Sequence, residues 1–180
     1  PLVGRDSVMT SAAQALDASP GCLVVEGEPK AGLTRIAVEV MKLAELRGAR
    51  LIWAESGESD PVERLEAGLA ASGLPANPNA AAASNSFAAY VGRCGAETQG
   101  NLARTLRGTA GLVVCEAETS VAAPSLRVGA IDREAGGRLV DSIDPSMDPA
   151  LREHVLATGD GLPGCIVSLA RAGDTGRLPD

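Results

Sequence analysis

Aromatic side chains are almost absent from this sequence: the 180 residues include one Trp, one Tyr and one Phe, which make up 2% of the chain. Proteins that hold single-stranded nucleic acid stack its bases on aromatic side chains, so that mode of binding is not expected here. Because 45% of the residues are hydrophobic, the core must be built from Val, Leu, Ile and Ala. The length suits one hydrophobic core with a small subdomain attached.

Excess positive charge is also lacking, since 16 basic residues face 23 acidic ones for a net charge of −7. A phosphate-backbone interface needs clustered Lys and Arg, so the charge balance disfavours nucleic acid as a partner of this chain. The sequence has no run of ~20 apolar residues and no signal peptide. We therefore expect no membrane association and a cytoplasmic location. The chain begins with Pro1 and not with Met, so we expect it to be part of a longer polypeptide.

Metal-binding and nucleophilic motifs are absent as well. The four cysteines show no C-x-x-C spacing, and we expect them to be reduced, structural residues: Cys22, Cys94, Cys115 and Cys165. His154 is the single histidine, so a zinc site with a histidine ligand or a Ser-His-Asp triad would have to use it. Its helical context predicts an exposed position without a catalytic role. The acidic clusters are explained by helix caps and turns and lack the spacing of a calcium loop.

The first half of the chain alternates strand and helix. A short apolar run, residues 22–26, precedes a glycine-containing loop, and apolar residues then repeat at helical spacing from Thr34 to Gly48. A second apolar run follows at residues 49–54. A strand, loop, helix and strand in this order form a βαβ unit, whose parallel strands are covered by helices on both faces. The fold class is therefore α/β.

The other expected elements follow from capping residues and apolar spacing. Residues 1–20 contain a short helix with Val8, Ala12, Ala15 and Leu16 on one face. Asp60 caps a helix that ends at Gly73, and residues 74–86 are expected to be irregular. A helix or helix pair is expected at 87–107, strands at 111–115 and 126–131, and helices at 132–143, 148–157 and 162–173.

The glycine loop carries the strongest functional signal in the sequence. It fits the pattern G-x-x-x-x-G-[K]-[ST] through consecutive residues, followed by Arg35: Gly27, Glu28, Pro29, Lys30, Ala31, Gly32, Leu33 and Thr34. Such a loop holds phosphate because successive backbone N–H groups point into it and the following helix adds the positive end of its dipole. The glycines permit the backbone angles and the close approach that this demands. Thr34 can offer its hydroxyl to Mg²⁺.

Leu33 occupies the position of the lysine that neutralises the phosphates. Loss of one preorganised electrostatic donor costs about 3–4 kcal/mol of transition-state stabilisation, or roughly 100- to 1,000-fold in rate. Binding should suffer less, because the backbone groups remain. Lys30 lies earlier in the loop and is an alternative source of positive charge, although its normal direction is outward. The competing interpretation is a tight turn in which the two glycines serve only the backbone.

Several segments together resemble the AAA-type ATPase module of STAND signalling ATPases, NB-ARC-like ATPases and large LuxR-like regulators. They are "PLVGRD" at residues 1–6, "LVVEGEPKAGLTRIAVEV" around the loop, "RGARLIWAES" in the next strand, and the C-terminal "IDREAGGRLVDSI" and "ATGDGLPGCIVSLARA". The resemblance implies a three-layer P-loop NTPase-like sandwich with a short parallel sheet at residues 1–131. A small helical lid would follow at residues 132–180.

The resemblance also implies a ligand and its contacts. The ligand would be ATP or ADP with Mg²⁺, and Val3, Gly4 and Pro163 would lie near the adenine. The family's Walker B strand ends in an acidic pair, whereas "GLVVCEAET" offers Glu116 beside Ala117, with Glu118 as a second candidate. The alternative for Glu116 is a solvated residue at the strand end. Fewer residues separate "GLVVC" from the lid than is usual in the family. This suggests that the Walker B strand or the following sensor strand is deleted or blurred. Arg127 is either a phosphate sensor or an exposed strand residue.

Three functional hypotheses follow from these residues. The leading one is a degenerate STAND or AAA-like regulatory module of a larger bacterial signalling protein, which binds ATP and hydrolyses it weakly or not at all. The first alternative is a pseudo-NTPase interaction scaffold that binds no nucleotide. The second is an active ATPase that uses Lys30. The expected partners are other domains of the same polypeptide and further proteins, with homo-oligomerisation left open.

Overall fold

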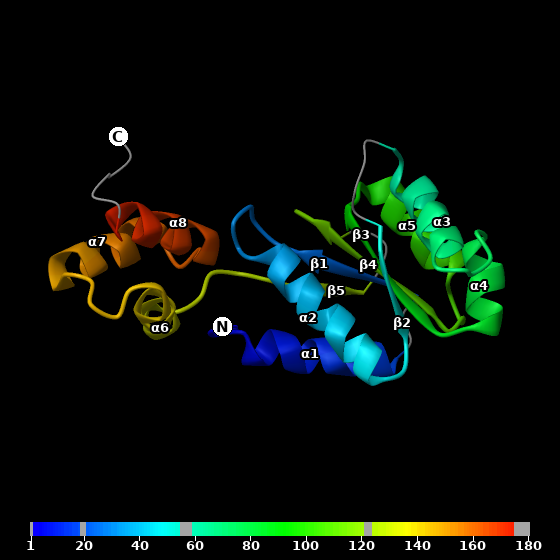
Figure 1. Ribbon diagram of the computed structural model, residues 1–180, viewed down its shortest axis with the longest axis horizontal. Coiled ribbons are helices and arrows are strands. Elements are labelled where there is room, and N and C mark those ends of the chain that lie inside the picture. The colour runs from blue at the N-terminus through cyan, green and yellow to red at the C-terminus, as the bar shows by residue number, and fades with distance from the viewer. Residues whose placement is uncertain (1, 19–20, 55–58, 121–123, 175–180) are drawn as a thin grey trace. The chain divides into compact units, whose positions relative to one another are not determined.

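The computed structural model describes residues 2–18, 21–54, 59–120 and 124–174 (Figure 1). Pro1, the first residue of the "PLVGRD" segment, lies outside them. The strands are β1 Cys22–Glu26, β2 Arg50–Trp53, β3 Phe87–Arg93, β4 Gly111–Ala117 and β5 Ser125–Arg127. The helices are α1 Asp6–Asp17, α2 Leu33–Leu46, α3 Pro61–Ala71, α4 Pro78–Ser84, α5 Ala96–Thr105, α6 Arg133–Ile143, α7 Pro149–Gly159 and α8 Pro163–Asp174.

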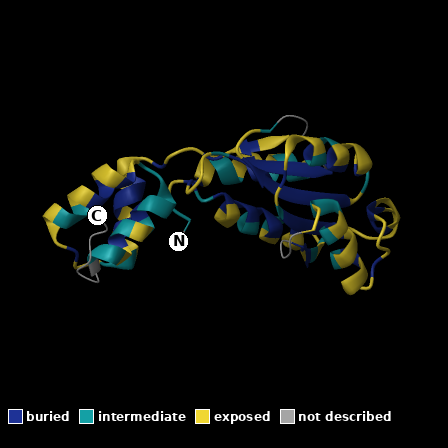
Figure 2. Cartoon of the chain, turned by 90° about the horizontal axis from the view of Figure 1, so that it is seen from above, coloured by how far each residue is buried: buried dark blue, intermediate teal, exposed yellow. Residues whose placement is uncertain are grey.

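The strands form one five-stranded sheet in the order β2-β3-β4-β1-β5, and every pair is parallel. All residues of β1 and β4 are buried, as expected of parallel strands that are covered on both faces (Figure 2). The prediction of an α/β fold with a parallel sheet is confirmed. Since parallel strands start at one edge of a sheet and end at the other, the glycine loop leaves from the carboxyl edge.

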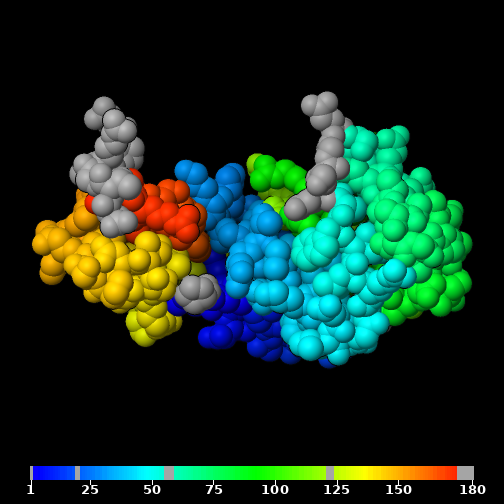
Figure 3. Space-filling view, viewed as in Figure 1, coloured from blue at the N-terminus to red at the C-terminus, as the bar shows by residue number. Residues whose placement is uncertain are grey.

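Helices cover both faces of the sheet. On one face, α2 buries a stripe of residues three or four positions apart: Leu33, Ile36, Ala37, Val40, Met41 and Ala44. Its side chains cover the sheet in the space-filling view (Figure 3). On the other face, α3 supplies the buried residues Leu65 and Leu69, and α5 supplies Leu102, with Leu106 directly after its end. The arrangement has three layers, as predicted.

The chain divides into two compact units. The first, here called the sheet unit, comprises residues 7–27 and 33–127. The second, the helical unit, comprises residues 1–6, 28–32 and 128–180. Its helices α6, α7 and α8 share an apolar core that includes Val140, Val155 and Ile166. Residues 28–32 of the glycine loop thus belong to the same unit as the C-terminal helices, while Gly27, Leu33 and Thr34 belong to the sheet unit. The predicted boundary between residues 131 and 132 stays a prediction.

Three predicted helix caps are confirmed. The carboxylate of Asp60 accepts from the backbone N–H of Val62, 2.8 Å away, and Pro61 occupies the first turn. Asp132 caps α6 and Asp148 caps α7 in the same way. Each carboxylate satisfies N–H groups that helix geometry leaves without a partner.

Three expectations about the elements are wrong. The strand expected at 126–131 is β5, which ends at Arg127. Residues 87–107 were expected to be helical, but Phe87–Arg93 forms the buried strand β3 and the helix α5 begins only at Ala96. A strand that is buried on both faces shows no apolar alternation, so its pattern does not separate it from a helix. Residues 74–86 were expected to be irregular, yet they contain α4. Its start is capped by Asn77, whose side chain accepts from two backbone N–H groups.

Candidate functional site: the glycine loop

The glycine loop begins with a tight turn. The backbone N–H of Ala31 donates to the carbonyl oxygen of Glu28 across 3.1 Å, with Pro29 and Lys30 at the two central positions. Lys30 has a φ of 68°. Proline followed by a residue of positive φ is the signature of a type II turn, in which the second position normally takes glycine. A lysine there costs about 1–2 kcal/mol, so the loop keeps this backbone shape despite strain. The side chain of Lys30 is exposed.

The second half of the loop leads into α2. Gly32 has a φ of 92°, and a Cβ atom at this residue would meet nothing within 4 Å. Helix α2 begins at Leu33. Within the described part of the chain, the backbone N–H groups of Gly32, Leu33 and Thr34 have no hydrogen-bond acceptor. Adjacent free N–H groups at the positive end of a helix are the chemical requirement for binding an anion.

Two carbonyl groups of loop residues 28–32 accept hydrogen bonds from other residues of the helical unit. The backbone N–H of Gly164, near the start of α8, donates to the carbonyl oxygen of Lys30 across 2.9 Å. The Arg5 guanidinium donates to the carbonyl oxygen of Ala31 across 2.8 Å. Arg5 is buried, and this burial lowers the pKa of its guanidinium. Both bonds engage carbonyl oxygens and leave the N–H groups of the second half of the loop uninvolved.

The residues predicted to lie near an adenine belong to the same unit as this turn. Val3 packs against the apolar core of the helical unit. A Cβ atom on Gly4, whose φ is 64°, would lie 2.6 Å from the Cβ atom of Ala135. Pro163 begins α8 and precedes Gly164 in the chain. Residues 28–32 and these three positions are therefore parts of one compact unit, although their contact with a nucleotide stays a prediction.

The first three residues of α2 differ in burial and in charge. Leu33 is 5% exposed, so its side chain is buried. Thr34 is exposed. The Arg35 guanidinium lies 2.9 Å from the Glu39 carboxylate, one helical turn along. Thr34 thus carries the side-chain hydroxyl at the start of α2, and no cationic side chain occupies the position of Leu33.

Glu116 is not the solvated strand-end residue of one interpretation, because it is 7% exposed and lies within β4. Its other interpretation, a Walker B acid, stays a prediction. Its carboxylate accepts a hydrogen bond from the phenol of Tyr90 in β3. The Tyr90 ring in turn meets Trp53 edge to face, with centroids 5.8 Å apart. Sequence reasoning missed this pair because it missed β3. Glu118 lies beyond the end of β4 and is exposed.

Two strands, β3 and β4, lie between β2 and β5 in the described part of the chain, and β4 contains "GLVVC". Which of them takes the place of the Walker B strand, and whether that strand or the sensor strand is deleted or blurred, stay predictions. β3 contains no Asp or Glu, and its last residue, Arg93, pairs in register with Glu116.

A buried carboxylate ends β1, directly before the glycine loop. Glu26 is 7% exposed and accepts from the backbone N–H of Ser120 across 2.6 Å. That bond, together with the Arg127 side chain 3.2 Å away, holds the pKa of Glu26 below its usual value. The side chain of Arg127 is 86% exposed. Arg127 therefore matches the interpretation as an exposed strand arginine.

Other chemistries find no support in the described residues. No group of three or more His, Cys, Asp or Glu side chains in that part of the chain is arranged to hold a metal ion. His154 is exposed, as predicted, and the four cysteines are free thiols. Among the helices of the described ranges, none has the length and apolar character to cross a membrane.

No protein-family model and no curated protein matches the chain. Several solved structures match the chain. A Walker-type ATPase of Pyrococcus abyssi matches with a TM-score of 0.64 and 11% identity over 97% of this chain and 69% of that one. The AAA domain of FIGL-1 in complex with ADP gives 0.63 and 16% identity, over 97% and 71%. A STAND protein with a tetratricopeptide repeat sensor from Pyrococcus horikoshii gives 0.57 and 12%, over 86% and 28%. The chain has the fold of AAA-type and STAND P-loop ATPase modules.

Proposed function

We propose that the chain is a regulatory nucleotide-binding module of the AAA or STAND type, part of a larger signalling protein, with weak or absent hydrolysis. The observation that carries this proposal is the row of free backbone N–H groups at Gly32, Leu33 and Thr34, in a chain with the fold of P-loop ATPases. The ligand would be ATP or ADP. The ADP complex of FIGL-1 supports this ligand class.

Phosphate binding would rest on the backbone of the loop. The carbonyl groups of Lys30 and Ala31 already accept bonds from Gly164 and Arg5. The N–H groups that follow remain available, and the start of α2 adds its partial positive charge. The absence of a Cβ atom at Gly32 leaves room for close approach of an anion. This arrangement favours binding without requiring a lysine.

Hydrolysis needs more than this backbone supplies. A P-loop ATPase stabilises the charge of the transferred phosphoryl group with a lysine and with Mg²⁺ held by a strand-end carboxylate. Leu33 is buried and uncharged, and β3 ends in Arg93 without any carboxylate. Glu116 on the next strand is already bonded to Tyr90. The Thr34 hydroxyl alone does not make a magnesium site.

The nucleotide-free scaffold remains the second candidate, because two observations favour it. Leu33 contributes its side chain to the core, and the N–H of Ala31 is used inside the turn. Under this hypothesis the loop serves only to connect β1 to α2. Under the third hypothesis, an active ATPase, the exposed side chain of Lys30 would have to turn toward the phosphates.

Two glycines allow the first two hypotheses to be separated. Gly32 and Gly48 have φ values of 92° and 88°, and a Cβ atom at either would meet nothing within 4 Å. Gly32→Ala and Gly48→Ala should therefore strain the backbone to a similar degree, while only the first alters the loop. In calorimetric titration with ATP, we expect binding by the parent and by Gly48→Ala and weaker binding by Gly32→Ala. Absence of heat from the parent at millimolar ATP would favour the scaffold.

A turnover assay addresses the active ATPase. Phosphate release by the parent and by Lys30→Ala is measured with Mg²⁺ present. We expect no release above background from either protein. Robust release by the parent that disappears in Lys30→Ala would overturn the proposal in favour of the active enzyme.

A further inference from the structure

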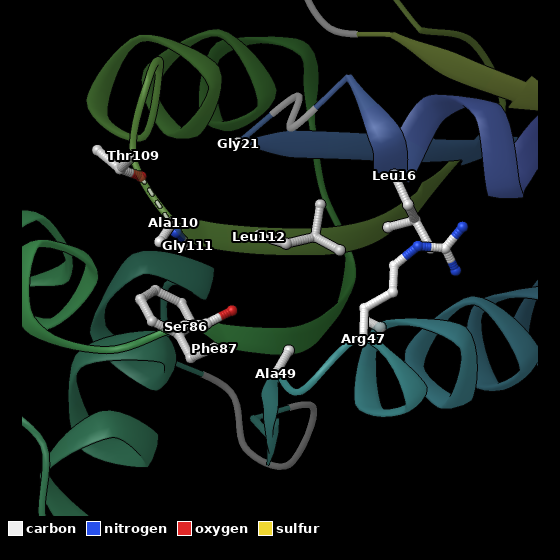
Figure 4. Close-up of a pocket in the computed structure, with 11 residues that line it drawn as sticks. Leu16, Gly21, Arg47, Ala49, Ser86, Phe87, Thr109, Ala110, Gly111 and Leu112 are labelled. Atoms are coloured by element: carbon white, nitrogen blue, oxygen red, sulfur yellow. Dashed lines mark hydrogen bonds between the residues drawn. The ribbon is translucent and has the colours of Figure 1, made fainter.

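A cavity of about 240 Å³ opens at the amino edge of the sheet, where the strands begin (Figure 4). It lies entirely within the sheet unit, between the last turns of α1 and α2 and the starts of β3 and β4. Its lining includes Leu16, Ala44, Arg47, Ala49, Ser86 and Leu112. The glycine loop leaves from the carboxyl edge of the same sheet. The cavity is therefore not part of the nucleotide site proposed above.

Two glycines allow the backbone to pack closely around this cavity. Gly21, just before β1, has a φ of 70°, and a Cβ atom there would lie 2.6 Å from the carbonyl oxygen of Leu106. A Cβ atom on Gly111 would lie 2.7 Å from the ring of Phe87. Larger residues at these positions would push the neighbouring segments apart. The segments around the cavity are thus closely packed at Gly21 and Gly111.

The chemistry of the walls is apolar and without net charge. Leu16, Ala44 and Leu112 contribute hydrocarbon surface. The Arg47 guanidinium is fixed by the Asp17 carboxylate, 2.9 Å away, and by the carbonyl oxygens of Ala13 and Leu43. Its charge is compensated and its edge is occupied, so it offers little to an anionic ligand.

Arg47 is nevertheless one of the residues that line the cavity. A guanidinium attracts electron-rich aromatic rings, and the indole ring most of all. The Ser86 hydroxyl adds one hydrogen-bonding group to the lining. A cavity of about 150 Å³ holds benzene, so the larger volume here suits a bicyclic ring. Size, charge and wall chemistry therefore agree on one class of ligand.

We propose that this cavity binds a small neutral aromatic molecule of about the size of indole. The site lies within the sheet unit, at the edge of the sheet opposite to the one from which the glycine loop leaves. Binding at this cavity does not require a nucleotide at the glycine loop, so each site can be tested independently of the other.

The experiment is an NMR titration of the ¹⁵N-labelled 180-residue chain with indole, with benzoate as the anionic probe. We expect saturable shifts in the amide resonances of Ala49, Ala110 and Leu112 with a dissociation constant below about 1 mM. Benzoate should bind at least tenfold more weakly. Absence of saturable shifts with indole, tighter binding of benzoate, or shifts confined to α6, α7 and α8 would overturn the proposal.

Cavity-filling variants show whether the shifts report this site. Ala49→Phe and Ala110→Phe place a ring on two different sides of the cavity, and Ala67→Phe places one on the exposed face of α3 as the matched control. At least a tenfold loss of indole affinity is expected for either folded cavity variant, with the parent's affinity retained in the control. Unchanged indole binding in a folded cavity variant would contradict the assignment. The use of two variants keeps the test valid should one of them fail to fold.

Discussion

The backbone N–H of Gly164 and the carbonyl oxygen of Lys30 lie 2.9 Å apart, so that the start of α8 is hydrogen-bonded to the turn of the glycine loop. Both residues belong to the helical unit. A Cβ atom at Gly164 would lie 3.0 Å from the carbonyl oxygen and from the Cβ atom of Lys30. The absence of a side chain at Gly164 thus allows this contact, and the contact supports a loop that carries a strained lysine.

Gly164→Ala should lower the free energy of unfolding by about 1 kcal/mol. Overpacking costs about 1–3 kcal/mol, and the higher helix propensity of alanine offsets only part of it. The matched control is Gly173→Ala in the same helix, where the new Cβ atom meets only the movable tip of Leu151. Chemical denaturation measures both changes. Equal stabilities of the two variants would show that the contact with Lys30 is unimportant.

Lys30→Gly should raise the stability of the protein, because glycine adopts a φ of 68° without the steric cost that lysine pays. The expected gain is about 1 kcal/mol after the larger entropy of the unfolded glycine chain is subtracted. Lys42→Gly within α2 serves as the control and should cost about 1 kcal/mol. If Lys30→Gly also destabilises the protein in denaturant melts, the left-handed turn at this position is not present in solution.

Leu33→Lys should lower the stability of the free protein and tighten its binding of ATP. The new ammonium group replaces a buried leucine at the positive end of α2, which is unfavourable until a phosphate neutralises it. Leu33→Met, which conserves volume, should change neither property greatly. Thermal melts with and without ATP measure both effects. Unchanged or weaker ATP affinity in Leu33→Lys would count against a phosphate site at this loop.

Glu26→Gln should make stability less sensitive to acid. The pKa of Glu26 is lowered in the folded protein, chiefly by the Ser120 N–H and also by Arg127. The stabilisation from this carboxylate is therefore complete above the unfolded pKa of about 4.3, and it is lost as the pH falls through the lower folded value. Denaturation curves from neutral to acidic pH measure the slope. Glu118→Gln, at an exposed position beyond β4, should keep the slope of the parent.

The sequence was informative wherever one short signal decided the local structure. Asp60 and Asp132 cap helices because a carboxylate and the following helical pattern suffice to place a helix start. The β1, loop and α2 segment was predictable for the same reason. The burial of Glu116 was not predictable, because it depends on Tyr90 in a neighbouring strand. β3 itself was missed because a strand buried on both faces has no alternation and because its Gly92 weakens the strand signal.

The loop illustrates the same limit at the candidate site. The order of Gly27, Gly32 and the helix start could be read from the chain, but the support from Arg5 and Gly164 could not. Those residues lie 26 and 134 positions from their acceptors, Ala31 and Lys30. Contacts across such separations depend on how the helical unit folds. The burial of Leu33 likewise follows from the packing of α2 and not from its place in the motif.

Under the proposed function, the backbone after the turn of the glycine loop binds an anion without the usual lysine. This is tested by a titration of the ¹⁵N-labelled chain with ADP, followed at the amide resonances of Gly32, Leu33 and Thr34. We expect saturable shifts at these three amides, larger than those at Gly48. If the three resonances stay in place at millimolar ADP, the loop is a connection between β1 and α2 and the nucleotide proposal is wrong.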